Sequence, residues 1–238
     1  MHMIRKPILQ FLVLCCLVQL SPVSMRAYRL VNNNWFSTPY PFGAQIISNP
    51  THVDLDGDTQ VEDLIFIANR TIISSNGISL WESPSTWQVK QTLVGDLNQD
   101  GRLEVILLVR RPFYPWPVDR WLPYGGRISE FQDSSGQGSH IILVGWQDSR
   151  YKEVWAGSSM SEPAIAMQVA DLNQDGRLEL LTLEGSYNDS NSFPAHTIKL
   201  WEWNGFGFSL LSTLSGNFND FEIIRSGSEH DNYFILVN

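Results

Sequence analysis

Short apolar runs rich in β-branched residues recur along the chain, and polar or glycine-containing segments separate them. Runs this short are typical of buried strands, because most helices need a longer stretch of periodic residues. The pattern therefore predicts an all-β fold. The clearest runs lie at 64–68, 105–109 and 180–183.

Pairs of apolar or aromatic runs also flank polar turns, which is the pattern of a β-hairpin. Asn76 and Asn204 are each followed by glycine, and tight hairpin turns favour this dipeptide. The predicted hairpins lie at 28–37, 71–81, 141–155 and 198–211, and two further strands lie at 221–226 and 233–238.

An acidic loop precedes each of the last three hairpins, and the second and third loops share the sequence Asp-Leu-Asn-Gln-Asp-Gly-Arg-Leu-Glu. Carboxylate or amide side chains occupy loop positions one, three, five and nine, and position seven offers a backbone carbonyl. The side-chain positions are Asp54, Asp56, Asp58 and Glu62; Asp96, Asn98, Asp100 and Glu104; and Asp171, Asn173, Asp175 and Glu179. Position seven is Gln60, Arg102 or Arg177.

This spacing suits a hard cation such as calcium, which takes about six to eight oxygen ligands at short distance. Gly101 and Gly176 occupy the sixth loop position, where the backbone must turn sharply, whereas the first loop has Thr59 there. Position twelve is Leu107 or Thr182 instead of the glutamate of an EF-hand, and the flanking runs are of the β type. We therefore expect three calcium sites in loops that join strands, with the first loop the least regular.

The pattern of an apolar strand, Asp-Leu-Asn-x-Asp-Gly-x-x-Glu and a second apolar strand resembles the FG-GAP or VCBS repeat of β-propellers, including those of integrin α chains. The resemblance covers most of the chain after residue 25, and it implies one calcium loop between the first two strands of a blade. It leaves function open, because the family includes adhesion proteins, lyases and other exported proteins.

An acidic loop with the strands around it makes one complete blade, and the chain contains three such units. The N-terminal hairpin and the two C-terminal strands would together form a fourth blade, which would cover the sheet edges that both otherwise expose. We therefore expect a small four-bladed propeller closed by the N-terminal strands. The turn 226–232 lacks the ligand spacing, so three calcium ions are expected instead of four. The alternatives are an open arc and a half-propeller completed by another chain.

The first 25 residues differ from the rest, because Arg5 and Lys6 precede an apolar run at 8–20 that is short for a membrane span. This pattern is typical of a secretory signal peptide, with an uncleaved anchor or a lipoprotein leader as alternatives. The chain then divides into a leader, 1–25, and a propeller domain, 26–238, without a membrane span. We expect an exported protein, whether secreted, periplasmic or on the cell surface.

The cysteine positions and the net charge further restrict how the domain can be stabilised and which partners it can bind. Both cysteines, Cys15 and Cys16, lie in the leader, so disulfides cannot stabilise the mature domain and bound metal is the natural substitute. The formal net charge is −9 and no window is strongly basic, which argues against a nucleic-acid partner.

The interval between the second and third acidic loops is longer than that between the first and second, which indicates an insertion at 110–139. It is rich in proline and aromatic residues, which resist regular structure and can stack on sugars or grip a peptide, while its arginines can contact acidic groups. The alternative is that the insertion caps the ring and buries its rings in the central channel. The candidate ligand-binding residues are Tyr114, Trp116, Arg120, Trp121, Tyr124 and Arg127.

We find no convincing catalytic centre in the sequence. The histidines lack metal-ligand spacing, no serine lies in a nucleophile elbow, and Glu130 with Asp133 is the only carboxylate pair that we consider for glycosidic chemistry. The sequence favours a calcium-binding recognition module, without catalysis, for a glycan or protein partner. The alternatives are a polysaccharide lyase on the same scaffold and a structural envelope protein.

Overall fold

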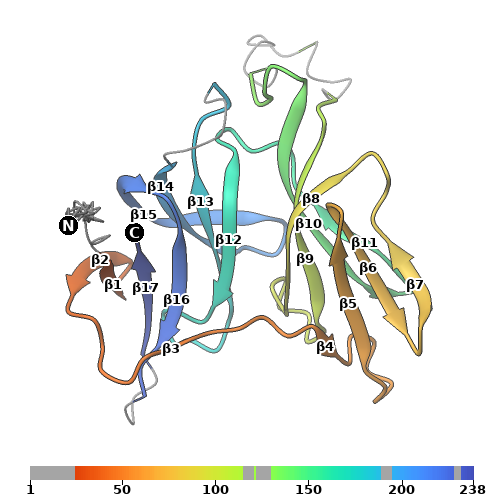
Figure 1. Ribbon diagram of the computed structural model, residues 1–238, viewed down its shortest axis with the longest axis horizontal. Helices are drawn as coiled ribbons and strands as arrows, with labels where there is room; N and C mark the ends of the chain where they lie inside the picture. Colours follow the sequence, from red (N-terminus) through yellow and green to blue (C-terminus); the bar gives the residue numbers. More distant parts are fainter. Residues whose placement is uncertain (1–24, 115–120, 122–129, 189–194, 228–231) are drawn as a thin grey trace, which may run out of the picture.

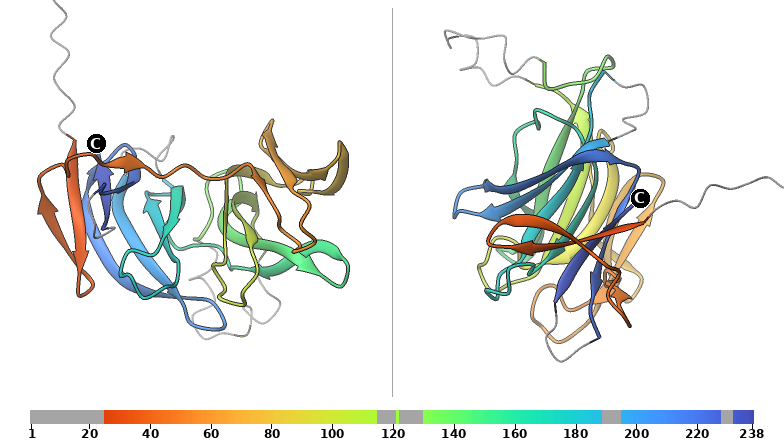
Figure 2. Two further views of the ribbon diagram at one scale, coloured as in Figure 1. Left: turned by 90° about the horizontal axis from the view of Figure 1, so that it is seen from below. Right: turned by 90° about the vertical axis from the view of Figure 1, so that its left-hand side faces the viewer.

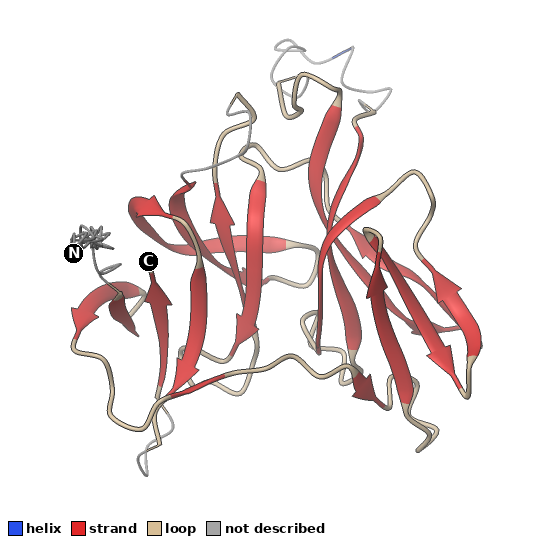
Figure 3. Cartoon of the chain, in the orientation of Figure 1, coloured by secondary structure: helices blue, strands red, loops and turns tan. Residues whose placement is uncertain are grey.

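The computed structural model describes residues 25–114, 121, 130–188, 195–227 and 232–238 (Figure 1). These residues form four small antiparallel sheets arranged in a ring, which is the arrangement of a four-bladed β-propeller. The described residues contain no α-helix, as the cartoon coloured by secondary structure makes plain (Figure 3). The all-β, four-bladed prediction is confirmed.

Three of the sheets are simple meanders of four consecutive strands, and each has its acidic loop between the first strand and the second. The predicted hairpins form the third and fourth strands in all three. The first sheet comprises β4 (His52–Val53), β5 (Glu62–Ile67), β6 (Arg70–Ser75) and β7 (Ile78–Glu82). The second comprises β8 (Gln88–Gly95), β9 (Glu104–Pro112), β10 (Gln137–Gln147) and β11 (Arg150–Ala156). The third comprises β12 (Ala164–Ala170), β13 (Glu179–Glu184), β14 (Ala195–Trp203) and β15 (Phe208–Phe218).

The fourth sheet joins the two ends of the propeller domain, as expected. Ala27 of β1 pairs with Leu236 of β17 in an antiparallel ladder, which removes an exposed edge from both. A short strand that the sequence did not predict adds to the other side, where Ile46 pairs with Ile224. The strands are β1 (Arg26–Val31), β2 (Asn34–Thr38), β3 (Gln45–Ile46), β16 (Phe221–Arg225) and β17 (Tyr233–Val237), in the order β2-β1-β17-β16-β3.

Neighbouring sheets pack face to face, and the apolar runs of the middle strands fill the space between them. In β9, Val105 and Leu107 belong to the cluster shared with the first sheet, whereas Ile106 and Leu108 belong to the cluster shared with the third sheet. Side chains alternate between the two faces of a strand, so a strand buried on both faces must be apolar at every position. This packing explains why the apolar runs are continuous instead of alternating.

The first sheet is less completely covered than the middle two. Leu64 packs against the core shared with the second sheet, whereas Ile65 and Ile67 are exposed. The segment that contains β3 runs from the fourth sheet across to β4 in the first (Figure 2). Among the described residues, each buried cluster that spans two sheets joins sheets adjacent in sequence.

The insertion in the second blade is shorter than the predicted segment 110–139. Strands β9 and β10 continue into it, with Arg110 paired to Ser139 and Pro112 paired to Gln137. The arginines at the end of β9 pair with β10, and their side chains lie against rings: Arg110 is 5.5 Å from the Tyr187 ring centre and Arg111 is 5.6 Å from that of Trp87. The insertion proper therefore begins after Pro112 and ends before Gln137.

The expected leader lies outside the described residues, except for residue 25. Within the part of the chain that the structure describes, no helix has the length and hydropathy needed to cross a bilayer.

Candidate metal centres

Each acidic loop forms the turn between the first and second strands of its sheet, so the prediction that these loops join strands is confirmed. The side chains converge in each loop. One ligand atom from each of three acidic residues lies within 4.8 Å of the other two, so that each group could hold a metal ion. The groups are Asp54, Asp56 and Asp58; Asp96, Asp100 and Glu104; and Asp171, Asp175 and Glu179.

Backbone N–H groups hold the second loop in shape. The amide of Asp100 donates to Asp96 Oδ1 at 3.0 Å and to Asn98 Oδ1 at 2.9 Å, and the amide of Gly101 donates to Asp96 Oδ2 at 3.0 Å. Gln99 and Gly101 have positive φ angles of 61° and 84°. The third loop repeats this pattern around Asp171 with distances that agree within about 0.1 Å. The loops are therefore organised by their own side chains.

The glutamates at position nine are buried at the base of these groups. Glu104 and Glu179 are each 1% exposed, and their Oε2 atoms accept the N–H groups of Leu97 at 3.1 Å and Leu172 at 2.8 Å. The second oxygen of Glu179, Oε1, is buried and has no hydrogen-bond partner among the described residues. A buried carboxylate oxygen without a partner is costly, and a cation held by the group would satisfy it.

The electrostatics of the two glutamates agree with this geometry. Burial raises the pKa of both Glu104 and Glu179 to about 7, with the neighbouring aspartates adding to the effect and the backbone N–H groups opposing it. Without a cation, each group thus favours the protonated form of its glutamate more than water does. A divalent cation favours the ionised form and would lower the pKa again.

The first loop has the same turn but a different set of side chains. Gly57 and Thr59 have φ angles of 81° and 73°, so glycine occupies position four and a β-branched residue adopts the left-handed conformation at position six. Glu62 is buried and its Oε2 accepts the N–H of Leu55 at 2.8 Å, but it is not a member of the acidic group. The side chain of Gln60 instead donates to Asp58 Oδ2 at 2.9 Å.

The remaining predicted ligands are the asparagines at position three and the residues at position seven. Asn98 and Asn173 donate to Asp100 and Asp175 through Nδ2, at 3.4 Å and 3.2 Å. At position seven, the side chain of Arg102 turns away to the carbonyl of Trp146 at 3.3 Å. A metal contact from Arg102, Arg177 or Gln60 would therefore come from the backbone, as the sequence predicted, and it stays a prediction.

Only two of the predicted ligand-binding residues of the insertion lie among the described residues. Tyr114 and Trp121 are 79% and 76% exposed, so these two rings are not buried in a central channel. The predicted residues Trp116, Arg120, Tyr124 and Arg127 lie outside the described residues.

The base of the insertion is a polar contact between two blades. The hydroxyl of Tyr187 accepts the N–H of Ser139 at 2.9 Å and donates to the carbonyl of Met160 at 2.9 Å. The segment 185–188, which follows β13 in the third blade, thus contacts the base of the insertion. Because both functions of the hydroxyl are engaged, Tyr187 serves to join the blades.

Asp133 is likewise engaged within its own turn. Its Oδ1 accepts the amides of Ser135 at 2.8 Å and Gln137 at 3.0 Å, and the Ser135 hydroxyl at 2.6 Å. Burial acts to raise the pKa of Asp133, but these hydrogen bonds lower it below the ordinary value. A carboxylate committed to its turn is a poor partner for Glu130 in acid–base chemistry.

The sequence analysis did not predict one network of charged side chains. Lys199 lies 2.7 Å from both Glu162 and the buried Glu184, and Glu184 also accepts the Thr182 hydroxyl at 2.6 Å. Glu184 is visible in the sequence as an acid at the end of an apolar strand. Its partner depends on the register of β13 against β14, which the sequence does not contain.

Together, the fold and the three loops define the class of this protein: a four-bladed propeller in which each of the first three blades carries an acidic group that could hold a metal ion. Comparisons with family models, with curated proteins and with solved structures give no match to the chain.

Proposed function

We propose that the protein is an exported, calcium-binding β-propeller that acts as a recognition module for a glycan or a protein, without catalysis. The observation that carries the calcium assignment is the buried, unpartnered oxygen of Glu179 within a preformed acidic group. The resemblance of the loops to FG-GAP or VCBS repeats points the same way.

The donor set favours calcium over other metals. All of the candidate ligands are oxygens of carboxylates, amides or backbone carbonyls, whereas zinc and copper sites are usually built with imidazole or thiolate. Magnesium demands a near-ideal octahedron and keeps several waters, while calcium accepts the irregular set of oxygens that a loop provides.

In this proposal the ions stabilise the ring. Each ion would offset most of the negative charge at one turn and hold the first two strands of a blade together. The propeller domain contains no cysteine, so metal binding would supply the cross-link that exported domains often obtain from disulfides. The exposed rings of Tyr114 and Trp121 provide a surface for recognition.

The preference for recognition over catalysis draws on two groups at the base of the insertion that the structure describes. A polysaccharide lyase would need a tyrosine, histidine or arginine free to act in a groove. The Tyr187 hydroxyl and the Asp133 carboxylate are each engaged in structural hydrogen bonds, which favours recognition over chemistry.

Thermal unfolding during calcium titration tests the metal assignment. Binding to the folded state alone stabilises by roughly 2.7 kcal/mol per site when free calcium is a hundredfold above its dissociation constant. We expect this gain in the wild type, its loss with a chelator, and a partial loss in the Asp100→Ala and Asp175→Ala variants. If neither calcium nor chelator changes the melting temperature, the proposal is wrong.

A further inference from the structure

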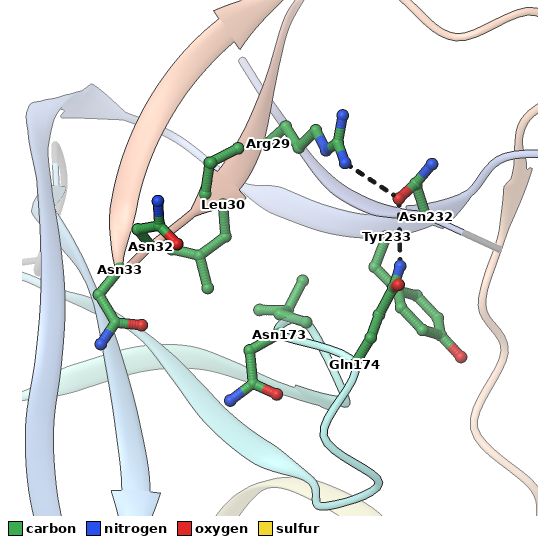
Figure 4. A pocket seen from close by; sticks show the side chains of 10 residues that line it. Arg29, Leu30, Asn32, Asn33, Asn173, Gln174, Asn232 and Tyr233 are labelled. Carbon is green, nitrogen blue, oxygen red and sulfur yellow. Dashed lines mark hydrogen bonds between the residues drawn. The ribbon is translucent and has the colours of Figure 1, made fainter. Parts of the chain in front are cut away.

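A cavity of about 340 Å³ opens where three distant segments of the chain meet (Figure 4). The segments are β1 with its turn to β2, the third acidic loop, and the residues at the start of β17. The volume falls within the range of about 300–1,000 Å³ that is usual for small-molecule sites. Its polar lining residues are Arg29, Asn32, Asn33, Asn173, Gln174 and Asn232.

The lining is rich in amides and contains no carboxylate, although the chain as a whole has a net charge of −9. The Oδ1 atom of Asn232 accepts hydrogen bonds from Arg29 at 3.3 Å and from Gln174 at 3.1 Å. Figure 4 shows these three side chains meeting on one side of the cavity, while Asn32 and Asn33 lie across from them on the β1–β2 turn. Hydrogen bonds thus connect side chains from separate segments.

The cavity also has apolar surface beside its amides. Leu30 and Leu172 line it and are nearly buried, and Tyr233 adds an aromatic ring. A sugar ring presents the matching combination, because its hydroxyls both donate and accept hydrogen bonds while its C–H face is apolar. Amide side chains likewise offer both donors and acceptors.

We propose that this cavity binds one sugar residue of a glycan. The amides would bond the ring hydroxyls, and the leucines and Tyr233 would contact its C–H face. Arg29, the one cation among the lining residues, would bond a hydroxyl or the carboxylate of an acidic sugar. The inference rests on the proposed recognition function, and it locates recognition at a site separate from the insertion.

The cavity shares a wall with the third acidic loop. Asn173 and Gln174 are positions three and four of that loop, and the Oδ1 of Asn173 accepts the N–H of Asp175 at 2.9 Å. A cation in the loop would therefore hold this wall in place. Sugar binding should then be weaker in a chelator, because the amides would be less well ordered.

The identical second loop supplies a matched control. Gln174 lines the cavity and Gln99 does not, although both occupy position four with φ angles of 63° and 61°. Glycine is tolerated at this position, since Gly57 occupies it in the first loop with φ 81°. The change of either glutamine to glycine thus removes an amide without straining the backbone.

The probe is an array of neutral and uronic-acid-containing oligosaccharides, followed by calorimetric titration with the strongest binder. We expect Gln174→Gly to weaken binding about five- to tenfold, as the loss of one or two hydrogen bonds implies, and Gln99→Gly to leave it unchanged. In a second pair, Asn33→Gly should likewise weaken binding and Asn76→Gly should leave it unchanged. Both asparagines have left-handed φ angles, and only Asn33 lines the cavity.

The outcomes separate this inference from the metal assignment. Failure of every oligosaccharide to bind, or equal losses in the Gln174 and Gln99 variants, would overturn it. If the protein prefers the uronic-acid oligosaccharides and Arg29→Gln removes this preference, the cavity binds an acidic sugar. If the neutral oligosaccharides bind and continue to bind in Arg29→Gln, the cavity binds a neutral sugar. If calcium does not stabilise the protein but Gln174→Gly still weakens sugar binding, the metal assignment fails and the sugar site stands.

Discussion

The first acidic loop and the later two share one backbone path but differ in the side chains that complete it. All three have left-handed residues at positions four and six, and a buried glutamate at position nine that accepts the N–H at position two. In the second and third loops the glutamate belongs to the acidic group, whereas Glu62 does not. A shared turn therefore does not guarantee an equivalent site.

The strands around the second and third loops are also more deeply buried than those around the first loop. Loops two and three lie in the middle sheets, where strands such as β9 are buried on both faces. Loop one joins the two-residue strand β4 to β5, whose Ile65 and Ile67 are exposed. We infer that the middle loops are held more firmly and that they contribute most of the metal-dependent stability.

The largest effect that distinguishes the loops should be a dependence on pH in the absence of metal. Burial raises the pKa of Glu104 and Glu179 from the ordinary 4.5 to about 7, so folding takes up a proton at each site. The stability from this proton uptake is complete at low pH and is lost as pH rises from about 4.5 through 7. It amounts to about 3 kcal/mol for each glutamate, because one pKa unit corresponds to about 1.36 kcal/mol.

Chemical denaturation in chelator between pH 5 and 8 measures this loss. The Glu104→Gln variant should lose less stability than the wild type over that range, and the difference between the two isolates the contribution of Glu104 from those of the other titratable groups. Parallel curves for the wild type and the variant would contradict the assignment. Calcium should abolish the loss, because it stabilises the ionised form.

The next largest effect concerns calcium itself. Glu104→Gln and Glu179→Gln should each remove most of the stabilisation from one site, roughly 2.7 kcal/mol at a hundredfold excess of free calcium. Glu62→Gln is the matched control, since Glu62 is equally buried and bonds the same loop position, yet it lies outside the acidic group. Calcium-dependent melting of the three variants is the measurement, and equal losses in all three would remove the distinction between the loops.

A smaller effect tests the backbone at position six. Gly101→Thr gives the second loop the residue of the first, and we expect a loss of about 1–2 kcal/mol from the left-handed conformation. Apart from the two neighbouring residues, no atom lies within 4 Å of an added Cβ, so we attribute the loss to the backbone conformation. Denaturant midpoints in chelator provide the value, and an unchanged midpoint would show that the loop adapts.

The reverse change should produce the smallest effect. Thr59→Gly removes the backbone strain of a β-branched residue at a φ angle of 73°, but glycine is also more flexible in the unfolded chain. We expect a net gain of at most about 1 kcal/mol in the same denaturation experiment. A loss would mean that the Thr59 side chain contributes contacts that outweigh its backbone strain.

Much of this fold could be predicted because its signals are local. The apolar runs, the Asn-Gly turns at 76–77 and 204–205 and the spacing of the acidic loops each lie within a short window. Even the fourth blade could be inferred, since an unpaired hairpin at one end and an unpaired strand pair at the other complement each other. Thr59 already marked the first loop as irregular, and the structure adds that Glu62 is not a member of the acidic group.

The rest depended on contacts between distant segments. Strand β3 pairs with the edge that β16 offers, and Arg110 extends β9 by pairing with Ser139 of β10 while its guanidinium group lies over the Tyr187 ring. The amide-lined cavity brings Arg29 and Asn232 to the third loop although they lie near opposite ends of the chain. No pattern in the sequence places these residues together.

The sequence by itself determined most of the strands, the turns and the ligand spacing, because these follow from side-chain periodicity and from backbone preferences at single residues. The tertiary structure alone decided which glutamates join an acidic group, how far the insertion reaches and where amides from three segments surround a cavity. Those features depend on the packing of one sheet against the next, which is a property of the whole fold and not of any one segment.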